Sequence, residues 1–408
     1  MRNETLCVNG MPISEAGFDS LTVPIHRAST IRFQNADEFS KRLHRGADGY
    51  IYGLYGTPTH RHLEKKITEL EGGCRTVLTP SGQAAITMVM LTTLGTSDRV
   101  LIPDSVYGPV RDFAKHELNT MGINVTFYDP CDMAALEKLI MSGVRLVWAE
   151  SPGSLTMEMQ DIPRIAAVAH AHGALLGCDN TWASPLNFKP LEHGADFVVE
   201  ALSKHLAGHS DILMGSITVR DEELGLRLKA ALGRIGIGTS PDDCALVMRG
   251  IETLSVRIRH SGEAGLVIAR WLATHPAVKR ILHPALPDAP GHALWKRDFT
   301  GSAGVFTVEF DQASSQHILP ALDALELVSI GASWGGTKSL AAPVTPGSLR
   351  SASPWAGPEV LLRLNIGLEH VDDLKIDFSR FLDRLEILTA QSKVTQRPQP
   401  NQMTGEMK

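Results

Sequence analysis

A lysine that directly follows a short apolar run is the residue of this sequence best suited to covalent chemistry. Lys204 lies in residues 201–211, a segment of mostly small and uncharged side chains, and the apolar residues 197–199 precede it. Removal from water favours the neutral form of an amine, and a neutral amine can condense with an aldehyde. Lys204 is therefore a candidate for Schiff-base formation, although most loop lysines are simply solvated charges.

A carboxylate at the end of another apolar run gives this lysine a chemical context. Asp179 follows the apolar residues 174–177 and lies 25 residues before Lys204. A carboxylate in such a place can keep a pyridine nitrogen protonated, and the protonated ring then accepts electrons from a carbanion. Asp179 and Lys204 together predict a site for pyridoxal 5'-phosphate (PLP). Alone, Asp179 would equally suit a helix cap or a turn.

A glycine turn could bind the phosphate of such a cofactor. Gly82 and Gln83 lie where an apolar run, residues 76–78, gives way to a helical pattern. The free amide groups at a helix N-terminus bind anions, and glycine lets the backbone approach them closely. The hydroxyl of Ser203, next to the lysine, could add a donor. On glycine spacing alone, a plain strand-to-helix turn is the favoured alternative.

The composition indicates a globular protein that acts on small molecules. The chain has 408 residues, 43% of them hydrophobic, and a formal net charge of −6. This length predicts two or three domains, and the hydrophobic content excludes a disordered or fibrous protein. Since the slight acidity is spread along the chain without a basic block, neither nucleic acid nor an anionic membrane is expected as partner.

Cysteine and histidine usage gives no sign of disulfides or of a metal. The five cysteines are widely spaced and form no Cys-x-x-Cys motif, which fits a reducing cytoplasm. No apolar run opens the chain or approaches membrane-spanning length, so no leader or membrane span is expected. The close histidine pairs lack acidic or cysteine partners at ligand spacing, and no metal site is expected; they are His60 with His62, His170 with His172, and His205 with His209.

The elements that would position these residues alternate between strands and helices. A helix is predicted over residues 161–172, because Asp161 can cap it, Pro163 fits its first turn and Gly173 ends it. Alternation of this kind predicts an α/β fold with a mostly parallel sheet between helices, whose ligands gather at the carboxyl ends of the strands. The predicted strands are residues 76–78, 100–102, 125–128, 146–149, 174–177, 197–199 and 212–219.

Changes in pattern along the chain suggest four parts. Residues 1–55 show little periodicity and predict an arm, and residues 56–250 form the large domain with the cofactor site. Residues 251–390 are mainly helical, with a strand over 304–310 and a terminal helix over 371–388, and predict a smaller α+β domain. Residues 391–408 are rich in Gln, Pro and Lys and predict a disordered tail.

These segments, in their order and spacing, resemble the Cys/Met metabolism family of PLP-dependent enzymes, most closely its bacterial cystathionine β-lyase branch. The resemblance covers roughly residues 15–388 and implies the aspartate-aminotransferase-like fold, PLP-dependent transferase fold type I. The motifs that carry it are residues 52–59, 70–73, 150–154, 179–182, 203–211, 283–287, 295–301, 333–336 and 363–369.

The resemblance implies a role for each residue of the cofactor site. Lys204 would hold PLP as an imine and then move the Cα proton, while Asp179 pairs with the pyridine nitrogen. Tyr107 would stack on the ring, although a packing aromatic is the plain alternative. Gly82, Gln83 and Ser203 would hold the phosphate, and Tyr52 would reach it from a neighbouring subunit.

The resemblance also implies a substrate site and an assembly. Arg363 would bind the substrate α-carboxylate with its two-pronged guanidinium, although an arginine among leucines can also be a surface residue with a buried stem. Ser333 and Trp334 would lie beside the substrate. The family's active sites are shared between subunits, which implies a homotetramer, a dimer of dimers, with the arm on a neighbouring subunit.

The implied activity is that of a carbon-sulfur β-lyase in transsulfuration and methionine biosynthesis. Cystathionine, or a related cysteine S-conjugate, would give a thiol such as homocysteine, with pyruvate and ammonia. Residues 150–154 lack the Asn-Pro of γ-acting relatives, which favours β-elimination. Leu54 replaces a usual phosphate-binding arginine, and Ala332 replaces a usual tyrosine. These departures leave two alternatives open: a γ-lyase for methionine, cystathionine or an O-linked homoserine analogue such as canavanine, and a PLP-binding homologue without activity.

Overall fold

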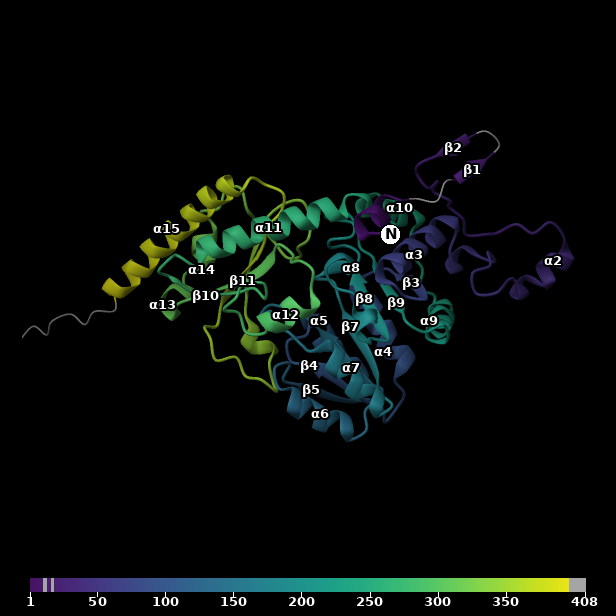
Figure 1. Cartoon of the computed structure of the whole chain (residues 1–408), viewed down its shortest axis with the longest axis horizontal. Coiled ribbons are helices and arrows are strands. Elements are labelled where there is room, and N and C mark those ends of the chain that lie inside the picture. The colour runs from purple at the N-terminus through teal and green to yellow at the C-terminus, as the bar shows by residue number, and fades with distance from the viewer. Residues whose placement is uncertain (10–12, 16–17, 396–408) are drawn as a thin grey trace, which may run out of the picture.

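A seven-stranded sheet forms the centre of the larger part of the molecule (Figure 1). The computed structural model describes residues 1–9, 13–15 and 18–395. The strand order is β3-β9-β8-β7-β6-β4-β5, and β9 alone runs antiparallel to its neighbours within the described sheet. The bounds are β3 Arg75–Thr79, β4 Arg99–Pro103, β5 Asn124–Tyr128, β6 Leu146–Glu150, β7 Leu175–Asp179, β8 Phe197–Ala201 and β9 Gly215–Val219.

The predicted strands are therefore present, and their ends lie within two residues of the predicted ends, except that β9 begins three residues later than predicted. Residues 212–214 precede β9 and are not part of the strand that the sequence predicts over 212–219. This segment belongs to the connection that carries Lys204. The β9 strand begins at Gly215, where the backbone passes so close to Ser81 that an added Cβ would lie 2.3 Å from its carbonyl oxygen.

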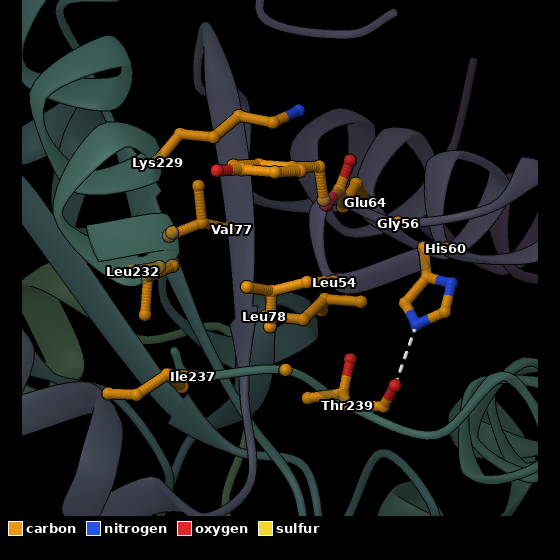
Figure 2. A pocket seen from close by; sticks show the side chains of 13 residues that line it. Leu54, Gly56, His60, Glu64, Val77, Leu78, Lys229, Leu232, Ile237 and Thr239 are labelled. Carbon is orange, nitrogen blue, oxygen red and sulfur yellow. Dashed lines mark hydrogen bonds between the residues drawn. The ribbon is translucent and has the colours of Figure 1, made fainter. Parts of the chain in front are cut away.

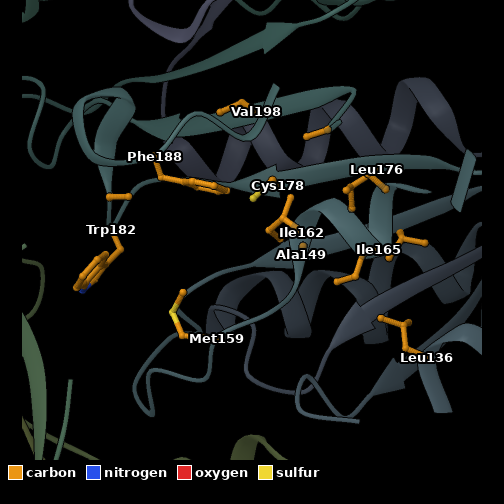
Figure 3. Packing of buried hydrophobic residues seen from close by; sticks show 14 of the residues in the cluster. Leu136, Ala149, Met159, Ile162, Ile165, Leu176, Cys178, Trp182, Phe188 and Val198 are labelled. Carbon is orange, nitrogen blue, oxygen red and sulfur yellow. The ribbon is translucent and has the colours of Figure 1, made fainter. Parts of the chain in front are cut away.

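Helices cover both faces of this sheet, which makes it a buried central layer. One face packs on α6 and α7, through a cluster that includes Leu136, Ile162 and Ile165 (Figure 3). The other face packs on α4 and α9. Strand residues alternate between the two clusters, as pleated strands require. The bounds are α4 Gly82–Thr93, α5 Gly108–Phe113, α6 Met133–Met141, α7 Ile162–Ala171 and α9 Glu222–Ile235.

The predicted helix over residues 161–172 is confirmed together with its start signal. Asp161 is the N-cap of α7, and its side chain accepts a hydrogen bond from the amide of Arg164. Gly177, in the middle of β7, lies against the indole of the buried Trp148 in the neighbouring strand. An added Cβ at Gly177 would lie 2.5 Å from that ring.

A second, five-stranded sheet lies in the C-terminal part, with the order β10-β11-β14-β13-β12. Helices α11 and α15 pack with it around a separate apolar cluster that includes Phe306 and Phe378. The bounds are β10 Val278–Leu282, β11 Val305–Phe310, β12 Ser329–Ile330, β13 Leu340–Val344, β14 Leu361–Asn365, α11 Leu254–Leu272, α12 His292–Asp298, α13 Gln312–Ser315, α14 Ile318–Leu322 and α15 Val371–Thr395.

The final helix runs further than the sequence pattern suggests. The α15 helix ends at Thr395, so residues 391–395 are helical and the prediction of a disordered tail from residue 391 is wrong for them. Residues 391–395 include neither glycine nor proline, so this segment has no helix-breaking residue. Residues 396–408 lie outside the described residues.

The N-terminal residues combine a packed helix with extended segments. Helix α1 (Asn3–Val8) buries Cys7 among α3 (Pro58–Glu71), α10 (Pro241–Glu252) and α11. The hairpin of β1 (Ile13–Glu15) and β2 (Phe18–Ser20) and helix α2 (Ala36–Ser40) extend from the body of the molecule (Figure 1).

One buried carboxylate fastens the two sheet-containing parts together. Asp104, just after β4, accepts hydrogen bonds from the amides of Ser351, Ala352 and Ser353 at 2.7–3.0 Å and from Arg111 at 2.8 Å. Burial raises the pKa of Asp104, but the hydrogen bonds from Ser353, Arg111 and Ser351 outweigh it and bring the pKa to about 2. The carboxylate is therefore charged at neutral pH.

Candidate active site

A cavity of about 300 Å³ collects nine of the ten residues predicted to form the site. Its walls come from the carboxyl ends of the large sheet and from the second sheet. Ile86, Glu150, Pro152, Thr181, Trp182 and Ala332 are among its other lining residues. The nine are Gly82, Gln83, Tyr107, Asp179, Ser203, Lys204, Ser333, Trp334 and Arg363.

The topology explains why residues far apart in sequence meet here. Asp179 is the last residue of β7, and Lys204 follows the end of β8, its parallel neighbour. Carboxyl ends of neighbouring parallel strands lie at one edge of a sheet, where α/β proteins bind ligands. Arg363 reaches the cavity from the middle of β14, so the second sheet supplies the opposite wall.

Lys204 is held in a state suited to nucleophilic chemistry. Burial lowers the pKa of its amine, the positive charge of Arg363 lowers it further, and the negative charge of Asp179 opposes them, leaving the pKa at about 8. The amine donates a hydrogen bond to the hydroxyl of Ser333 and lies 5.4 Å from the centre of the Trp334 ring. A substantial fraction of neutral amine is thus present near pH 8.

The segment that carries Lys204 is fixed from behind by Arg257 of α11. Its guanidinium donates to the carbonyl of His205 at 2.8 Å, and also to those of Leu206 and Gly250. An added Cβ at Gly208, whose φ is +71°, would collide with this guanidinium. Glycine at 208 is therefore required both by the backbone and by the arginine.

Asp179 is fixed by the residues that follow it. One carboxylate oxygen accepts a hydrogen bond from the amide of Thr181 at 2.9 Å, and the Thr181 hydroxyl in turn accepts from the amide of Ala201 at 2.9 Å. Burial raises the pKa of Asp179, while Thr181 and Lys204 lower it. A protonated ring nitrogen beside this carboxylate would favour its charged form.

The N-terminal end of α4 lines the cavity. Ser81 caps the helix by accepting from the amide of Ala84 at 3.0 Å, and the first amides of a helix have no acceptor within it. Gly82 is needed because an added Cβ would lie 2.6 Å from the Cβ of Ala201. Among the described residues that line the cavity, Lys204 and Arg363 are the basic ones.

Glu150 is a site residue to which the sequence analysis gives no role. It ends β6 opposite Asp179 in the neighbouring strand, and its carboxyl accepts a hydrogen bond from the amide of Tyr107 at 2.7 Å. Burial and then the Asp179 charge raise the pKa of Glu150 well above its usual range. Glu150 directly follows the predicted strand 146–149, which is the same kind of signal that indicates Asp179.

Tyr107 and Arg363 both line the cavity, and each affects the pKa of the other. Tyr107 is 45% exposed, and burial followed by the Glu150 charge raises the pKa of its hydroxyl, while Arg363 lowers it. Burial lowers the pKa of Arg363, whose guanidinium donates to the carbonyl of Ser333 at 3.2 Å. The remaining donors of the guanidinium fit a carboxylate.

Tyr52 is the predicted site residue that the structure does not bring to the cavity. Its side chain is 49% exposed, and its backbone pairs with Thr30 in the N-terminal segment. Two residues later, Leu54 lines a different cavity between α3 and α9, with Ile237 and Thr239 (Figure 2). Leu54 therefore packs within its own chain.

Two buried glutamates lie behind the strand end that carries the site. Glu71 at the end of α3 is 0% exposed and Glu200 in β8 is 1% exposed, and the two carboxyl groups influence each other's pKa. Neither carboxyl oxygen of Glu71 has a hydrogen-bond donor among the described residues. Glu200 accepts from the side-chain amide of Asn180 at 3.1 Å. Burial raises the pKa of Glu71 to about 8. Burial, and then the neighbouring Glu71, raise the pKa of Glu200 well above its usual range. Two ionised carboxylates offer each other no donor, so the pair favours a protonated state in the folded chain.

The histidines have other contacts, and the described residues contain no group of three or more His, Cys, Asp or Glu that could hold a metal ion. His60 contacts the carbonyl of Thr239, and His170 contacts Asp196 at 2.9 Å. His205 packs on Trp334, with ring centres 5.3 Å apart. In the described part of the chain, every helix is too short or too polar to cross a membrane.

Comparison with known proteins adds the decisive observation. The family model described as Cys/Met metabolism PLP-dependent enzyme matches residues 4–383. The chain belongs to this family. It is 43% identical over 374 residues to a putative cystathionine β-lyase of Rhizobium johnstonii, covering 90% of this chain and 92% of that protein. It is 40% identical to the cystathionine β-lyase of Bordetella avium, covering 91% and 94%.

Solved structures confirm the expected fold type. The cystathionine γ-synthase of Xanthomonas oryzae pv. oryzae, in complex with aminoacrylate and cysteine, superposes with a TM-score of 0.87 and 30% identity. The match covers 95% of this chain and 99% of that one. The chain is thus a PLP-dependent enzyme of the fold type that its motifs predict, and PLP is its cofactor.

The donor set of the cavity fits PLP. The amine of Lys204 suits an aldehyde, the carboxylate of Asp179 suits a ring nitrogen, and the free amides at the start of α4 suit a phosphate. Gln83 has an amide oxygen that is buried without a hydrogen-bond partner, which leaves one polar group of the cavity unsatisfied in the chain itself.

Proposed function

We propose that this protein is a carbon-sulfur β-lyase that acts on L-cystathionine or related cysteine S-conjugates. In the overall reaction, one S-substituted cysteine and one water give a thiol, pyruvate and ammonia. The observation that carries the proposal is the juxtaposition of Lys204, with its lowered pKa, Asp179 and Arg363 in one cavity of a chain that is 36–43% identical to several cystathionine β-lyases.

In this proposal the chain's own residues bind the substrate and move a proton. Arg363 binds the α-carboxylate and thereby orients the Cα–H bond toward Lys204. The neutral amine of Lys204 removes the Cα proton, which its lowered pKa permits near neutral pH. Bound PLP supplies the sink for the electron pair left at Cα. Asp179 keeps the ring nitrogen charged, Tyr107 packs against the ring, and Ser333 and Trp334 flank the amine.

The phosphate would be held by Gly82 and Gln83 at the start of α4, with the hydroxyl of Ser203. We infer that Tyr52 completes this end of the site from a second subunit, because it lies outside the cavity of its own chain and is half exposed. This implies a homo-oligomer, for which we propose a tetramer built as a dimer of dimers. Mixing Lys204→Ala and Tyr52→Ala subunits should restore activity if the sites are shared, and no recovery would contradict sharing.

We also place the protein in the cytoplasm. All five cysteines are free, two of them exposed, as expected in a reducing compartment. Thiol labelling of the native protein isolated from cells should find Cys74 and Cys131 reduced.

The reaction is tested by identifying its keto acid. Pyruvate from cystathionine or another cysteine S-conjugate supports β-elimination, whereas 2-oxobutyrate or homoserine would indicate the γ-acting alternative. The variant Lys204→Ala should abolish turnover, and the exposed Lys296→Ala serves as the matched control. Full activity of the Lys204 variant would overturn the proposal.

A further inference from the structure

Residues 150–160 form a closed loop that supplies part of the cavity wall. The side-chain amide of Gln160 donates a hydrogen bond to the carbonyl of Glu150 at 2.8 Å, which joins the two ends of the loop. Further along, the amide of Gly153 donates to the carbonyl of Glu158 at 2.8 Å. The loop residues that line the cavity are Glu150, Pro152, Gly153, Ser154, Leu155 and Met157.

The tip of this loop has an unfavourable backbone conformation. Leu155 has a φ of +67° and Met157 a φ of +60°, in the left-handed region that residues other than glycine rarely adopt. Such residues persist where the surrounding structure fixes them, and they are common at functional sites. A contact from outside the loop is therefore expected to hold the tip.

Arg350 supplies such a contact from the C-terminal part of the molecule. It follows the short helix η5 (Pro346–Leu349), and its side chain is 5% exposed. One nitrogen of its guanidinium donates to the hydroxyl of Thr156 and to the carboxylate of Glu158. The Thr156 hydroxyl donates to the other oxygen of that carboxylate at 2.7 Å. These three side chains thus contact one another on either side of Met157 in the sequence.

The backbone that carries Arg350 is fixed as well. The amides of the next three residues, Ser351–Ser353, donate to the buried carboxylate of Asp104. The hydroxyl of Ser353 accepts a hydrogen bond from the Arg350 guanidinium at 3.0 Å. The guanidinium therefore reaches the loop from a backbone that is bonded to the end of β4.

We propose that Arg350 is a positioning residue, which holds Leu155 and Met157 in the cavity wall and thereby sets how the substrate is seated. Arg350 is not among the described residues that line the cavity, so it acts through Thr156 and Glu158. The inference rests on the proposed function in taking the cavity as the site of an amino-acid substrate. It does not depend on what a second subunit adds, because all of these contacts lie within one chain.

The test measures kcat/KM per cofactor-loaded site with the amino acid from which wild type releases keto acid fastest. Arg350→Gln leaves the tip of the loop free to shift, and a small misplacement of the substrate is costly, so kcat/KM should fall by about tenfold or more. Arg350→Lys should lose less, because it keeps a positive charge beside Glu158. The PLP affinity should stay within about twofold, since Lys204, Asp179 and Gly82 lie outside the loop. Unchanged kcat/KM in Arg350→Gln would overturn the inference.

A double variant tests whether Arg350 acts through the loop. Glu158→Gln should also lower kcat/KM, and its combination with Arg350→Gln should lose little more than the worse single variant. Losses that add in full would contradict action through Glu158. Thr156→Val removes only one hydroxyl and should give a smaller loss of the same sign, which keeps the inference testable if the arginine variants do not fold.

A control variant distinguishes positioning from general stability. Asp377 is buried in the C-terminal part, where it accepts hydrogen bonds from the amides of Glu326, Leu327 and Val328 and lies apart from the lining of the cavity. Asp377→Asn should lower the urea midpoint and leave kcat/KM per loaded site unchanged. An equal loss of kcat/KM in Asp377→Asn and Arg350→Gln would overturn the positioning role.

Binding of an unreactive amino acid separates this inference from the proposed function. L-Norleucine has the α-groups of a substrate but no leaving group, and its binding to the holoenzyme is followed by cofactor absorbance. Its Kd should rise by about fivefold or more in Arg350→Gln, whichever reaction the enzyme catalyses. Absence of keto acid from every sulfur amino acid would refute the lyase assignment alone, whereas an unchanged Kd would refute the role of Arg350.

Discussion

Replacing Glu71 by glutamine tests whether the buried Glu71–Glu200 pair holds a proton that the unfolded chain releases. Burial raises the pKa of Glu71 from about 4.5 to about 8 in the folded chain. Between these values the folded chain binds more protons than the unfolded chain. The free energy of unfolding must therefore fall as the pH rises, by up to about 1.4 kcal/mol per pH unit for one proton.

The Glu71→Gln variant should lose much of this pH dependence. The side-chain amide introduced by the substitution does not titrate, so the proton that Glu71 binds in the folded chain is no longer part of the folding equilibrium. Burial still raises the pKa of Glu200 in the variant, so the pH dependence that is lost is the share of Glu71. Relative to wild type, the variant should gain stability as the pH rises from about 5.5 to about 7.5, by up to about 3 kcal/mol for one proton. The exposed Glu69→Gln, on the same helix, is the matched control.

The assay is urea unfolding of the holoenzyme at several pH values within this window. The difference between wild type and variant is the informative quantity, because the other titrating groups are common to both and cancel. Parallel stability profiles for wild type and Glu71→Gln would refute the raised pKa of Glu71 in the folded chain. A profile of Glu69→Gln as altered as that of Glu71→Gln would show that the effect does not depend on the buried pair.

Four further predictions follow from the site and the core. The apoenzyme should capture PLP about tenfold faster per pH unit up to about pH 8 and level off above it, because neutral Lys204 is the reactive form; a flat profile would contradict its lowered pKa. Arg363→Lys should raise KM by about tenfold or more in steady-state assays, since lysine cannot bind a carboxylate with two parallel hydrogen bonds. Gly177→Ala should cost about 1–3 kcal/mol in urea unfolding through collision with the indole of Trp148, and Trp148→Phe should recover part of that loss. Asp104→Asn should cost about 3–5 kcal/mol in the same assay, because it removes the charge partner of a buried arginine; an unchanged midpoint would count against the fastening role of this carboxylate.

The large sheet and the cofactor site were predictable because their signals are local. Asp179 and Lys204 each follow an apolar run, and the parallel arrangement of β7 and β8 brings such residues together without further information. The cap of α7 at Asp161 likewise depends on a few neighbouring residues. Fold type, family and cofactor are confirmed, while the roles of the individual site residues stay predictions.

The features that were missed depend on contacts between distant segments. Glu71 and Glu200 meet only because α3 packs on the sheet, and no local pattern indicates a buried pair of carboxyl groups that are 129 residues apart in the sequence. The antiparallel direction of β9 follows from the tertiary fold and not from its own apolar run. The polar composition of residues 391–395 suggests disorder, but the helix continues through them because they contain no glycine or proline.

The connection between β8 and β9 has a mechanical consequence for the lysine it carries. The two ends of this connection pair with each other in an antiparallel ladder, in which Ala201 lies opposite Gly215. Between these ends, Arg257 donates hydrogen bonds to the backbone carbonyls of His205 and Leu206. These contacts hold the backbone at Lys204 in place. The amine therefore changes its position by rotation about the side-chain bonds of the lysine. In the proposed reaction, this rotation would let the amine of Lys204 reach two neighbouring atoms in turn, without a rearrangement of the loop.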